Sequence, residues 1–323
     1  MKKIFFMSLG LLALTACQKS LTDPAEYDIQ ISAEETTMYA GDPVKFNIEG
    51  DIDNLVFYSG ETGHRYEYRD RYAVAMEDVL KADLSLKMTG NYGLPNGLEI
   101  YVNTGFEGLK GNDAAADRAT MKALAAGNME GWTRIPYEDP VKYPNSVDIA
   151  FPVSDYLESF CLAVHWNPDN EQDKPLRTYT ANGAVSLELK GAGATDIDLA
   201  ALDFTTLMMD EKAPDAYNIP SGNGRIILND PKQGAIFFKG AKKGTVAWDL
   251  DSWAISKPMP LNKVTPDRGE VIKNLQNSLG SFTHVYTEPG EYEATFVGIN
   301  ASIDGSSKKI ITKKIIILDR PLD

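Results

Sequence analysis

The chain has little cysteine and little histidine. In 323 residues there are two cysteines, Cys17 and Cys161, and three histidines, His64, His165 and His284. No two of the histidines stand at the spacing of a zincin or a zinc finger. The sequence therefore predicts neither a metal site nor another cofactor.

Positive charge is also scarce. Lys and Arg together number 32 against 46 Asp and Glu, which gives a net charge of −14 at pH 7. Such a surface repels nucleic acid and anionic lipid headgroups, so nucleic acid is excluded as a natural partner. Hydrophobic residues at 43% and charged residues at 24% are ordinary globular proportions. The length suits two domains, each with its own core.

Recognisable catalytic motifs are missing as well. The chain contains no Gly-x-Ser-x-Gly nucleophile elbow. "SGNGRI", which starts at residue 221, lacks the Gly-Lys-Ser/Thr ending of a phosphate loop and is interpreted as a hairpin turn. Pairs of carboxylates arise by chance among so many acids, so their spacing decides nothing about glycoside hydrolysis. We therefore predict that the protein is not an enzyme.

The N-terminus carries the most specific signal that is present. Lys2 and Lys3 precede an apolar run, residues 4–13, that is too short to span a bilayer as a mature helix. The following Leu-Thr-Ala-Cys, residues 14–17, matches the bacterial lipobox. The match implies a signal peptide over residues 1–16 and diacylation of Cys17. An ordinary secretory signal that happens to contain a cysteine is the alternative.

Lipidation at Cys17 has two consequences for the mature chain. Two or three acyl chains hold a protein stably on a membrane that it does not span. Residues 17–25 then form a short polar tether. Cys161 remains as the one unmodified cysteine, so no intramolecular disulfide is expected. Because Cys161 lies in the apolar run "FCLAVHW", we expect a small core residue there.

Both ends of the chain carry patterns of a β-sandwich. Near the N-terminus, strands are expected at residues 27–32, 44–48 and 55–58, which are too few for a stable domain. Near the C-terminus, "SFTHVYTEPGEYEATFVGIN" (residues 281–300) and "SSKKIITKKIIIL" (residues 306–318) supply a hairpin and a last strand. This hairpin, with "AGDPVKF" at residues 40–46, resembles immunoglobulin-like domains of the polycystic-kidney-disease (PKD) type.

We therefore predict one discontinuous PKD-like sandwich built from residues 26–78 and 278–323. A second domain inserted between them needs only neighbouring ends. Two incomplete sandwiches at opposite ends of the chain are the alternative. The paired lysines 308, 309, 313 and 314 fit an edge strand protected against strand addition, with a glycan or phosphate patch as the alternative.

Residues 79–277 are predicted to form a jelly-roll-like β-sandwich. Short apolar stretches separated by Gly, Asn, Pro and Asp recur throughout this region. One short helix is expected in "NDAAADRATMKALAAGNM", with Asn112 or Asp113 as its N-cap and Gly127 at its end. A second helix is expected in "DRGEVIKNLQNS" (residues 267–278). The chain as a whole is thus predicted to be all-β with one or two short helices.

Several segments, taken in order, resemble a Bacteroidetes lipoprotein family of unassigned function. They are "FYSGETGHRYEYRDR", "LEIYVNTGFEG" followed by Trp132-Thr133, "FCLAVHW", "WAISKP" and the closing PKD-like hairpin. The resemblance covers essentially the whole mature chain and departs around residues 106–131 and 205–230. It implies a surface glycan-binding lipoprotein of the outer membrane, encoded near starch-utilisation-type transporters. It carries over no binding residue.

Glycan binding requires flat aromatic faces together with amide, carboxylate or Arg groups. Trp132, Trp248 and Trp253 stand in apolar strand contexts, where packing is expected. The candidates for glycan contact lie in or beside polar loops, with core packing as the alternative for each; they are Trp166, Tyr137, Tyr143, Tyr179 and Arg177.

The predicted function is that of a non-catalytic carbohydrate-binding lipoprotein that captures polysaccharide or oligosaccharide at the cell surface. The alternative is an adhesin or assembly lipoprotein that binds a protein partner, such as an outer-membrane transporter. Aromatic side chains gathered in one set of loops would favour glycan. A broad exposed apolar patch or an uncapped sheet edge would favour a protein partner.

Overall fold

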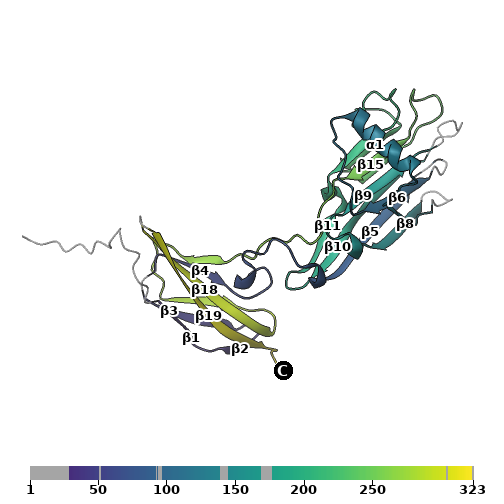
Figure 1. Ribbon diagram of the computed structural model, residues 1–323. Coiled ribbons are helices and arrows are strands. Elements are labelled where there is room, and N and C mark those ends of the chain that lie inside the picture. The colour runs from purple at the N-terminus through teal and green to yellow at the C-terminus, as the bar shows by residue number, and fades with distance from the viewer. Residues whose placement is uncertain are drawn as a thin grey trace, which may run out of the picture. The chain divides into compact units, whose positions relative to one another are not determined.

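A computed structural model describes residues 29–50, 52–91, 93, 97–138, 145–168, 177–302 and 305–321 (Figure 1). In these ranges the chain is all-β, as predicted, with one α-helix and a few short 3₁₀ helices. It divides into two compact units. The first unit combines the N-terminal part of the chain through Asp70 with residues from Pro266 onward, and the second is Arg71–Thr265.

The first unit is a sandwich of two sheets, whose strand orders are β1-β3-β17 and β16-β4-β18-β19-β2. The strands are β1 (Gln30–Ala33), β2 (Thr37–Tyr39), β3 (Pro43–Glu49), β4 (Asn54–Tyr58), β16 (Glu270–Lys273), β17 (Ser281–Val285), β18 (Gly290–Ser302) and β19 (Gly305–Leu318). Strands from the two ends of the chain pair directly, β3 with β17 and β4 with β18. The predicted discontinuous sandwich is thereby confirmed.

Aromatic side chains from both ends of the chain form the core of this unit. Alternation along β3 turns Phe46 inward, where it meets Phe57 of β4 and Phe296 of β18 at ring-centroid distances of 4.9–5.7 Å among the three. The buried Tyr286 donates its hydroxyl hydrogen to the Ser59 carbonyl oxygen at 2.9 Å. Packing of this kind requires both segments, so neither end is expected to fold without the other.

The last strand ends the sheet for most of its length. Among the described strands, β19 pairs on its outer side only with β2, and only through Ile316, Ile317 and Leu318. The paired lysines precede this contact, at residues 308–309 and 313–314. Their position agrees with the interpretation that charge protects this edge against strand addition.

The helix predicted over residues 267–278 is wrong, because part of that segment is strand β16. Val271 pairs with Val56 and Lys273 with Leu55 of β4. At Gly269 a Cβ atom would lie 2.4 Å from Cγ1 of Val56, so the close approach of the segment to the sheet needs a glycine. Sheet pairing overrides the local helical pattern here. Residues 266–277 thus belong to the first unit, whereas the sequence predicted that the C-terminal part of this unit begins at residue 278.

The second unit begins at residue 71, whereas the sequence predicted that it begins at residue 79. Val74 donates its backbone N–H to the Asn262 carbonyl at 2.9 Å, and the Lys190 N–H reaches the Asp78 carbonyl at 2.9 Å. Val74 is also buried in the core of the second unit. Backbone bonds and packing thus place residues 71–78 in the second unit.

The second unit is a sandwich of two antiparallel sheets. Their orders are β13-β14-β10-β5-β8, with β11 also beside β10, and β12-β15-β9-β6-β7. The strands are β5 (Val79–Gly90), β6 (Leu98–Asn103), β7 (Thr133–Ile135), β8 (Asn145–Pro152), β9 (Cys161–Trp166), β10 (Tyr179–Leu189), β11 (Gly193–Asp198), β12 (Phe204–Met208), β13 (Arg225–Asp230), β14 (Gly234–Lys239) and β15 (Ser252–Ser256). The prediction that a β-sandwich is inserted in the sequence between the two parts of the first unit is confirmed.

Apolar side chains from both sheets meet in one core. Leu84 and Leu86 of β5 face Ile100 of β6 and Val164 of β9, and all four are almost fully buried. The short 3₁₀ helices of the described residues are η1 (Tyr66–Tyr68), η2 (Met76–Asp78), η3 (Ser154–Tyr156) and η4 (Leu199–Leu202). None of the described helices is long and apolar enough to cross a membrane.

One helix, α1 (Ala114–Ala126), lies on the outer face of the second sheet (Figure 1). Asp113 is its N-cap, as predicted, and accepts from the Ala116 N–H at 3.1 Å. Met121 of α1 packs with Cys161 and Trp253 in a second apolar cluster. Burial raises the pKa of the Cys161 thiol to about 12, so this thiol remains protonated at neutral pH.

The second unit is expected to fold when residues 71–265 are expressed alone. The buried residues of both apolar clusters lie between Val74 and Leu261, so the excised piece keeps all of them. Circular dichroism should show one cooperative thermal transition. An aggregated or unstructured product would contradict the division into units.

Candidate ligand-binding site

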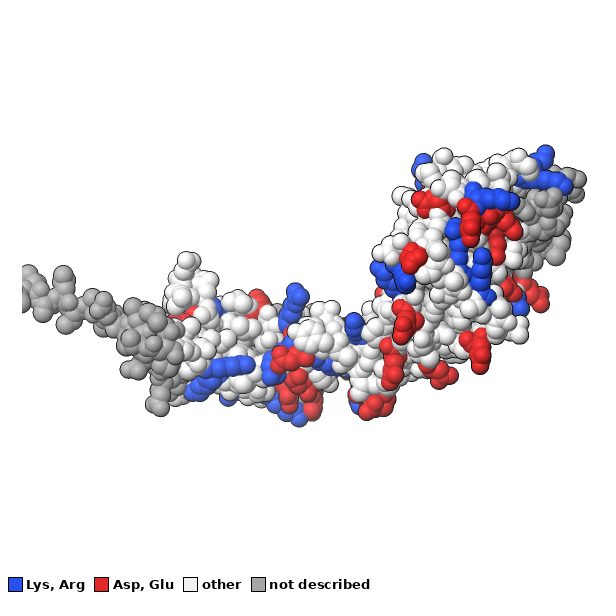
Figure 2. Space-filling view, turned by 45° about the horizontal axis from the view of Figure 1, so that its top comes forward, with Lys and Arg blue, Asp and Glu red and all other residues white. Residues whose placement is uncertain are grey.

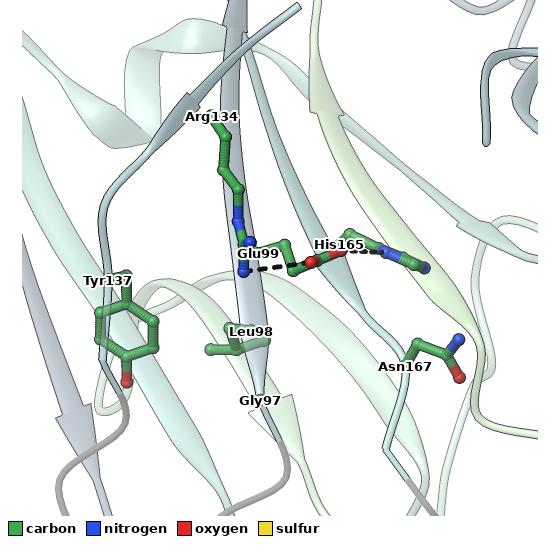
Figure 3. A pocket seen from close by; sticks show the side chains of 7 residues that line it. All are labelled: Gly97, Leu98, Glu99, Arg134, Tyr137, His165 and Asn167. Atoms are coloured by element: carbon green, nitrogen blue, oxygen red, sulfur yellow. Dashed lines mark hydrogen bonds and ion pairs between the residues drawn. The ribbon is translucent and has the colours of Figure 1, made fainter. Parts of the chain in front are cut away.

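A polar pocket opens on the outer face of the sheet β12-β15-β9-β6-β7 (Figure 3). It has a volume of about 380 Å³ and is lined by Gly97, Leu98, Glu99, Arg134, Tyr137, His165 and Asn167. Strand alternation explains this set. Leu98 and Ile100 point into the core, so Glu99 points outward, and Val164 and Trp166 likewise place His165 outside.

Register brings the outward side chains into a row across three strands. Glu99 of β6 lies opposite His165 of β9, and His165 lies opposite Trp253 of β15. On the other side of β6, Tyr101 lies opposite Arg134 of β7. Directly opposite residues in a sheet have neighbouring side chains, so these residues meet although they are far apart in the sequence.

His165 lies in the middle of this row and contacts the residues on both sides of it. Its Nδ1 lies 3.2 Å from Oε2 of Glu99, and its Nε2 lies 2.8 Å from Oδ1 of Asp251. The imidazole also stacks on the indole of Trp253, with ring centroids 3.9 Å apart and planes 8° from parallel. A ring held at both nitrogens and on one face has little freedom to reorient.

Glu99 is ionised, and both of its carboxylate oxygens have partners within the protein. Burial acts to raise its pKa, but the hydrogen bonds to His165 and Tyr101 and the charge of Arg134 outweigh burial, so the pKa lies below its ordinary value. Arg134 Nη2 stands 3.1 Å from Oε1, and the Tyr101 hydroxyl donates to Oε2 at 3.0 Å. Burial and the bond to Glu99 raise the pKa of Tyr101 to about 12, so its hydroxyl remains a donor.

Exposure rises from the base of the site to its rim. Trp253 is 2% exposed and Tyr101 8%, whereas the side chains of His165, Glu99 and Arg134 are 14%, 38% and 59% exposed. A ligand entering the pocket therefore meets Arg134 at the rim, supported from below by groups that are already fixed. Such pre-organisation lowers the entropy cost of binding.

Of the residues predicted from the sequence, Tyr137 lines this pocket and also packs against the core. Tyr143 and Cys17 lie outside the described residues. The prediction that the Trp166 side chain is exposed to solvent is wrong. Strand β9 continues through Trp166, whose side chain points inward beside Val164 and meets Phe238 at 5.8 Å between ring centroids.

Tyr179 and Arg177 are also buried, at 0% and 1% exposure, where the sequence analysis placed them in or beside a loop. Tyr179 opens β10 and pairs with Gly90 of β5. Arg177 occupies the space above the same glycine, where an added Cβ would lie 2.7 Å from its Cδ. Because none of these three side chains reaches the surface, we do not retain Trp166, Tyr179 or Arg177 as glycan contacts.

Four residues of the pocket are not among those predicted from the sequence: Glu99, Arg134, His165 and Asn167. A partial signal for two of them was available, because alternation in "LEIYVN" and "CLAVHW" places Glu99 and His165 opposite the apolar face. Nothing local could show that β6, β7, β9 and β15 are neighbours.

The chemistry of the pocket suits hydrogen-bonded recognition. No Ser, Thr or Cys side chain is among the residues that line it. In the described part of the chain, no group of three or more His, Cys, Asp or Glu residues is arranged to hold a metal ion. What the pocket offers instead is a guanidinium, an amide, a phenol and an imidazole–carboxylate pair.

Comparison with known families gives one match. The family model described as "Domain of unknown function (DUF5017)" matches residues 16–126, about a third of the chain. The matched segment includes Glu99 but ends before Arg134 and His165. A search of curated proteins finds no match to this chain.

Proposed function

We propose that the protein is a non-catalytic carbohydrate-binding lipoprotein and that the pocket at Glu99, Arg134 and His165 is its glycan site. The observation that carries the proposal is the set of planar polar side chains fixed on a rigid sheet and open to solvent. Sugar hydroxyls both donate and accept hydrogen bonds. Guanidinium and amide groups, each with more than one bonding position, are suited to bind them.

Tyr137 supports the same assignment. Its ring lies at the wall of the pocket, beside Leu98 and across from His165 (Figure 3). An aromatic ring with an apolar neighbour provides the flat surface against which the C–H face of a sugar packs. The pocket thus combines the two kinds of contact that carbohydrate recognition requires.

The state of Glu99 favours binding over hydrolysis. A glycosidase needs a carboxylic acid that can donate a proton and a second carboxylate across a cleft. The pKa of Glu99 lies below its ordinary value, and both of its oxygens already accept contacts within the protein. At neutral pH this group positions its neighbours and is unsuited to act as an acid.

Anchoring at Cys17 and placement at the outer membrane belong to the proposal. They are supported by the lipobox at residues 14–17 and by the polar tether that follows it. A lipid anchor would keep the glycan site close to the cell surface, where captured polysaccharide can be passed to a transporter.

The test is affinity electrophoresis of the soluble chain from Ser20 onward through gels containing plant, host or microbial polysaccharides. Retardation by one glycan class, without release of sugar from it, is the expected result. Absence of retardation in every gel would overturn the proposal and favour a protein partner. The surface to probe next would then be edge strand β16 of the first unit, where Val271 is 64% and nearby Leu275 74% exposed.

A further inference from the structure

Some polar groups of the pocket already have hydrogen-bond partners within the protein, and others have open positions. Glu99 receives Arg134 at Oε1 and both Tyr101 and His165 at Oε2, so its carboxylate has little capacity left for a ligand. His165 is held at both nitrogens by Glu99 and Asp251. These residues shape the site and hold Arg134 in place, and they are positioning residues.

Two pocket groups keep unused hydrogen-bonding positions. Among the described residues, the guanidinium of Arg134 has Glu99 as its one partner, reached through Nη2. The amide of Asn167, also at the pocket, has no partner in the same part of the chain. Arg134 therefore offers donors, and Asn167 offers two donors and an acceptor.

The positive charge of Arg134 is already paired within the site. Arg134 faces Glu99, and the imidazole faces a second carboxylate, Asp251. In the view of Figure 2, basic and acidic side chains of the second unit are interspersed rather than gathered by sign. The chain as a whole carries a net charge of −14. An anionic ligand would have to compete with Glu99 for Arg134 and would approach a repulsive surface.

We infer that the ligand of this pocket is a neutral glycan whose hydroxyls bind Arg134 and Asn167, an inference that rests on the proposed function. Hydroxyls accept from the guanidinium and both accept from and donate to the amide. They do so without displacing the ion pair beneath. Uronic-acid and sulfated polysaccharides are disfavoured, because Glu99 already neutralises the charge of the guanidinium.

The experiment compares neutral and acidic polysaccharides in parallel affinity gels, at low and at high salt. Galactomannan, xyloglucan and laminarin serve as neutral probes, and polygalacturonate, alginate and chondroitin sulfate as acidic ones. We expect retardation only among the neutral probes, with an affinity that changes by less than about twofold with salt, because no net charge is neutralised on binding.

A charge variant sharpens the comparison. Glu99→Gln removes the competing carboxylate, keeps the size of the side chain and leaves Arg134 unneutralised. This variant should gain retardation by polygalacturonate at low salt. Its thermal unfolding is measured alongside, and Asn167→Ala, at an exposed position, provides an independent variant that should weaken retardation by the neutral glycan at least about fivefold.

The outcomes separate the two proposals. Retardation by acidic probes alone in the unaltered protein would overturn the neutral-glycan inference and leave carbohydrate binding standing. Neutral retardation that Asn167→Ala leaves unchanged would also overturn it. If neither group of probes retards the protein, the proposed function fails and the inference fails with it.

Discussion

Replacing Trp166 by Ala should lower the free energy of unfolding of the second unit by about 3–5 kcal/mol. The indole is completely buried between the two sheets and contacts Phe238 across the core. Its removal leaves a cavity larger than the surrounding strands can close, because the backbone on either side is fixed by pairing with β6 and β15. The effect should appear as a lower midpoint in urea unfolding followed by tryptophan fluorescence.

Tyr137→Ala is the matched control for this prediction. Tyr137 is aromatic and belongs to the same unit, but it is only half-buried, at the wall of the pocket. Its removal should cost clearly less stability than the removal of Trp166. If Trp166→Ala left the unfolding midpoint unchanged and instead abolished glycan binding, the indole would be a surface contact after all, and the packing described for β9 would be wrong.

Arg134→Ala should weaken glycan binding by about 10- to 100-fold. Hydrogen bonds from a charged donor contribute about 1.5–3 kcal/mol, and each 1.4 kcal/mol corresponds to a tenfold change in affinity. Arg134 stands at the rim with its side chain 59% exposed, so its removal should scarcely change stability. The dissociation constant is obtained by titrating the retarding glycan in affinity gels or by calorimetry.

Lys81→Ala controls for the loss of a positive charge. Lys81 is equally exposed in the same unit, but it lies on β5 of the other sheet, where it pairs with Asp83 at 3.2 Å. Its replacement should leave affinity within about twofold. Equal losses from the two variants would mean that general charge, and not the pocket, governs binding.

The sequence allowed the first unit to be predicted because its signals are local. The alternation in "VKFNI" and the Pro-Gly turn at residues 289–290 define strands, and each end alone leaves an unsatisfied apolar face. The N-cap at Asp113 and the burial of Cys161 were readable for the same reason. The segment at residues 267–278 failed because its pairing with β4 outweighs its helical pattern.

The candidate site was harder to predict because it depends on register and strand order. A shift of one residue in the end of β9 decides whether Trp166 or its neighbours His165 and Asn167 face the solvent. From the sequence, Trp166 is the last residue of its strand and its side chain is expected to face the loop that follows, whereas strand alternation turns that side chain into the core. The contact between His165 and Trp253 requires β9 and β15 to be neighbours, although nearly ninety residues separate them.

The central claim is that glycan binds beside His165, and the imidazole itself can report it. The chain has only three histidines, and His64 and His284 both lie in the first unit, so they serve as internal controls. Carbon-13 and proton NMR of the imidazole resonances is recorded while the retarding glycan is added, with assignment by His165→Gln. The account predicts shifts confined to His165; shifts of His64 or His284, or none at saturation, would contradict it.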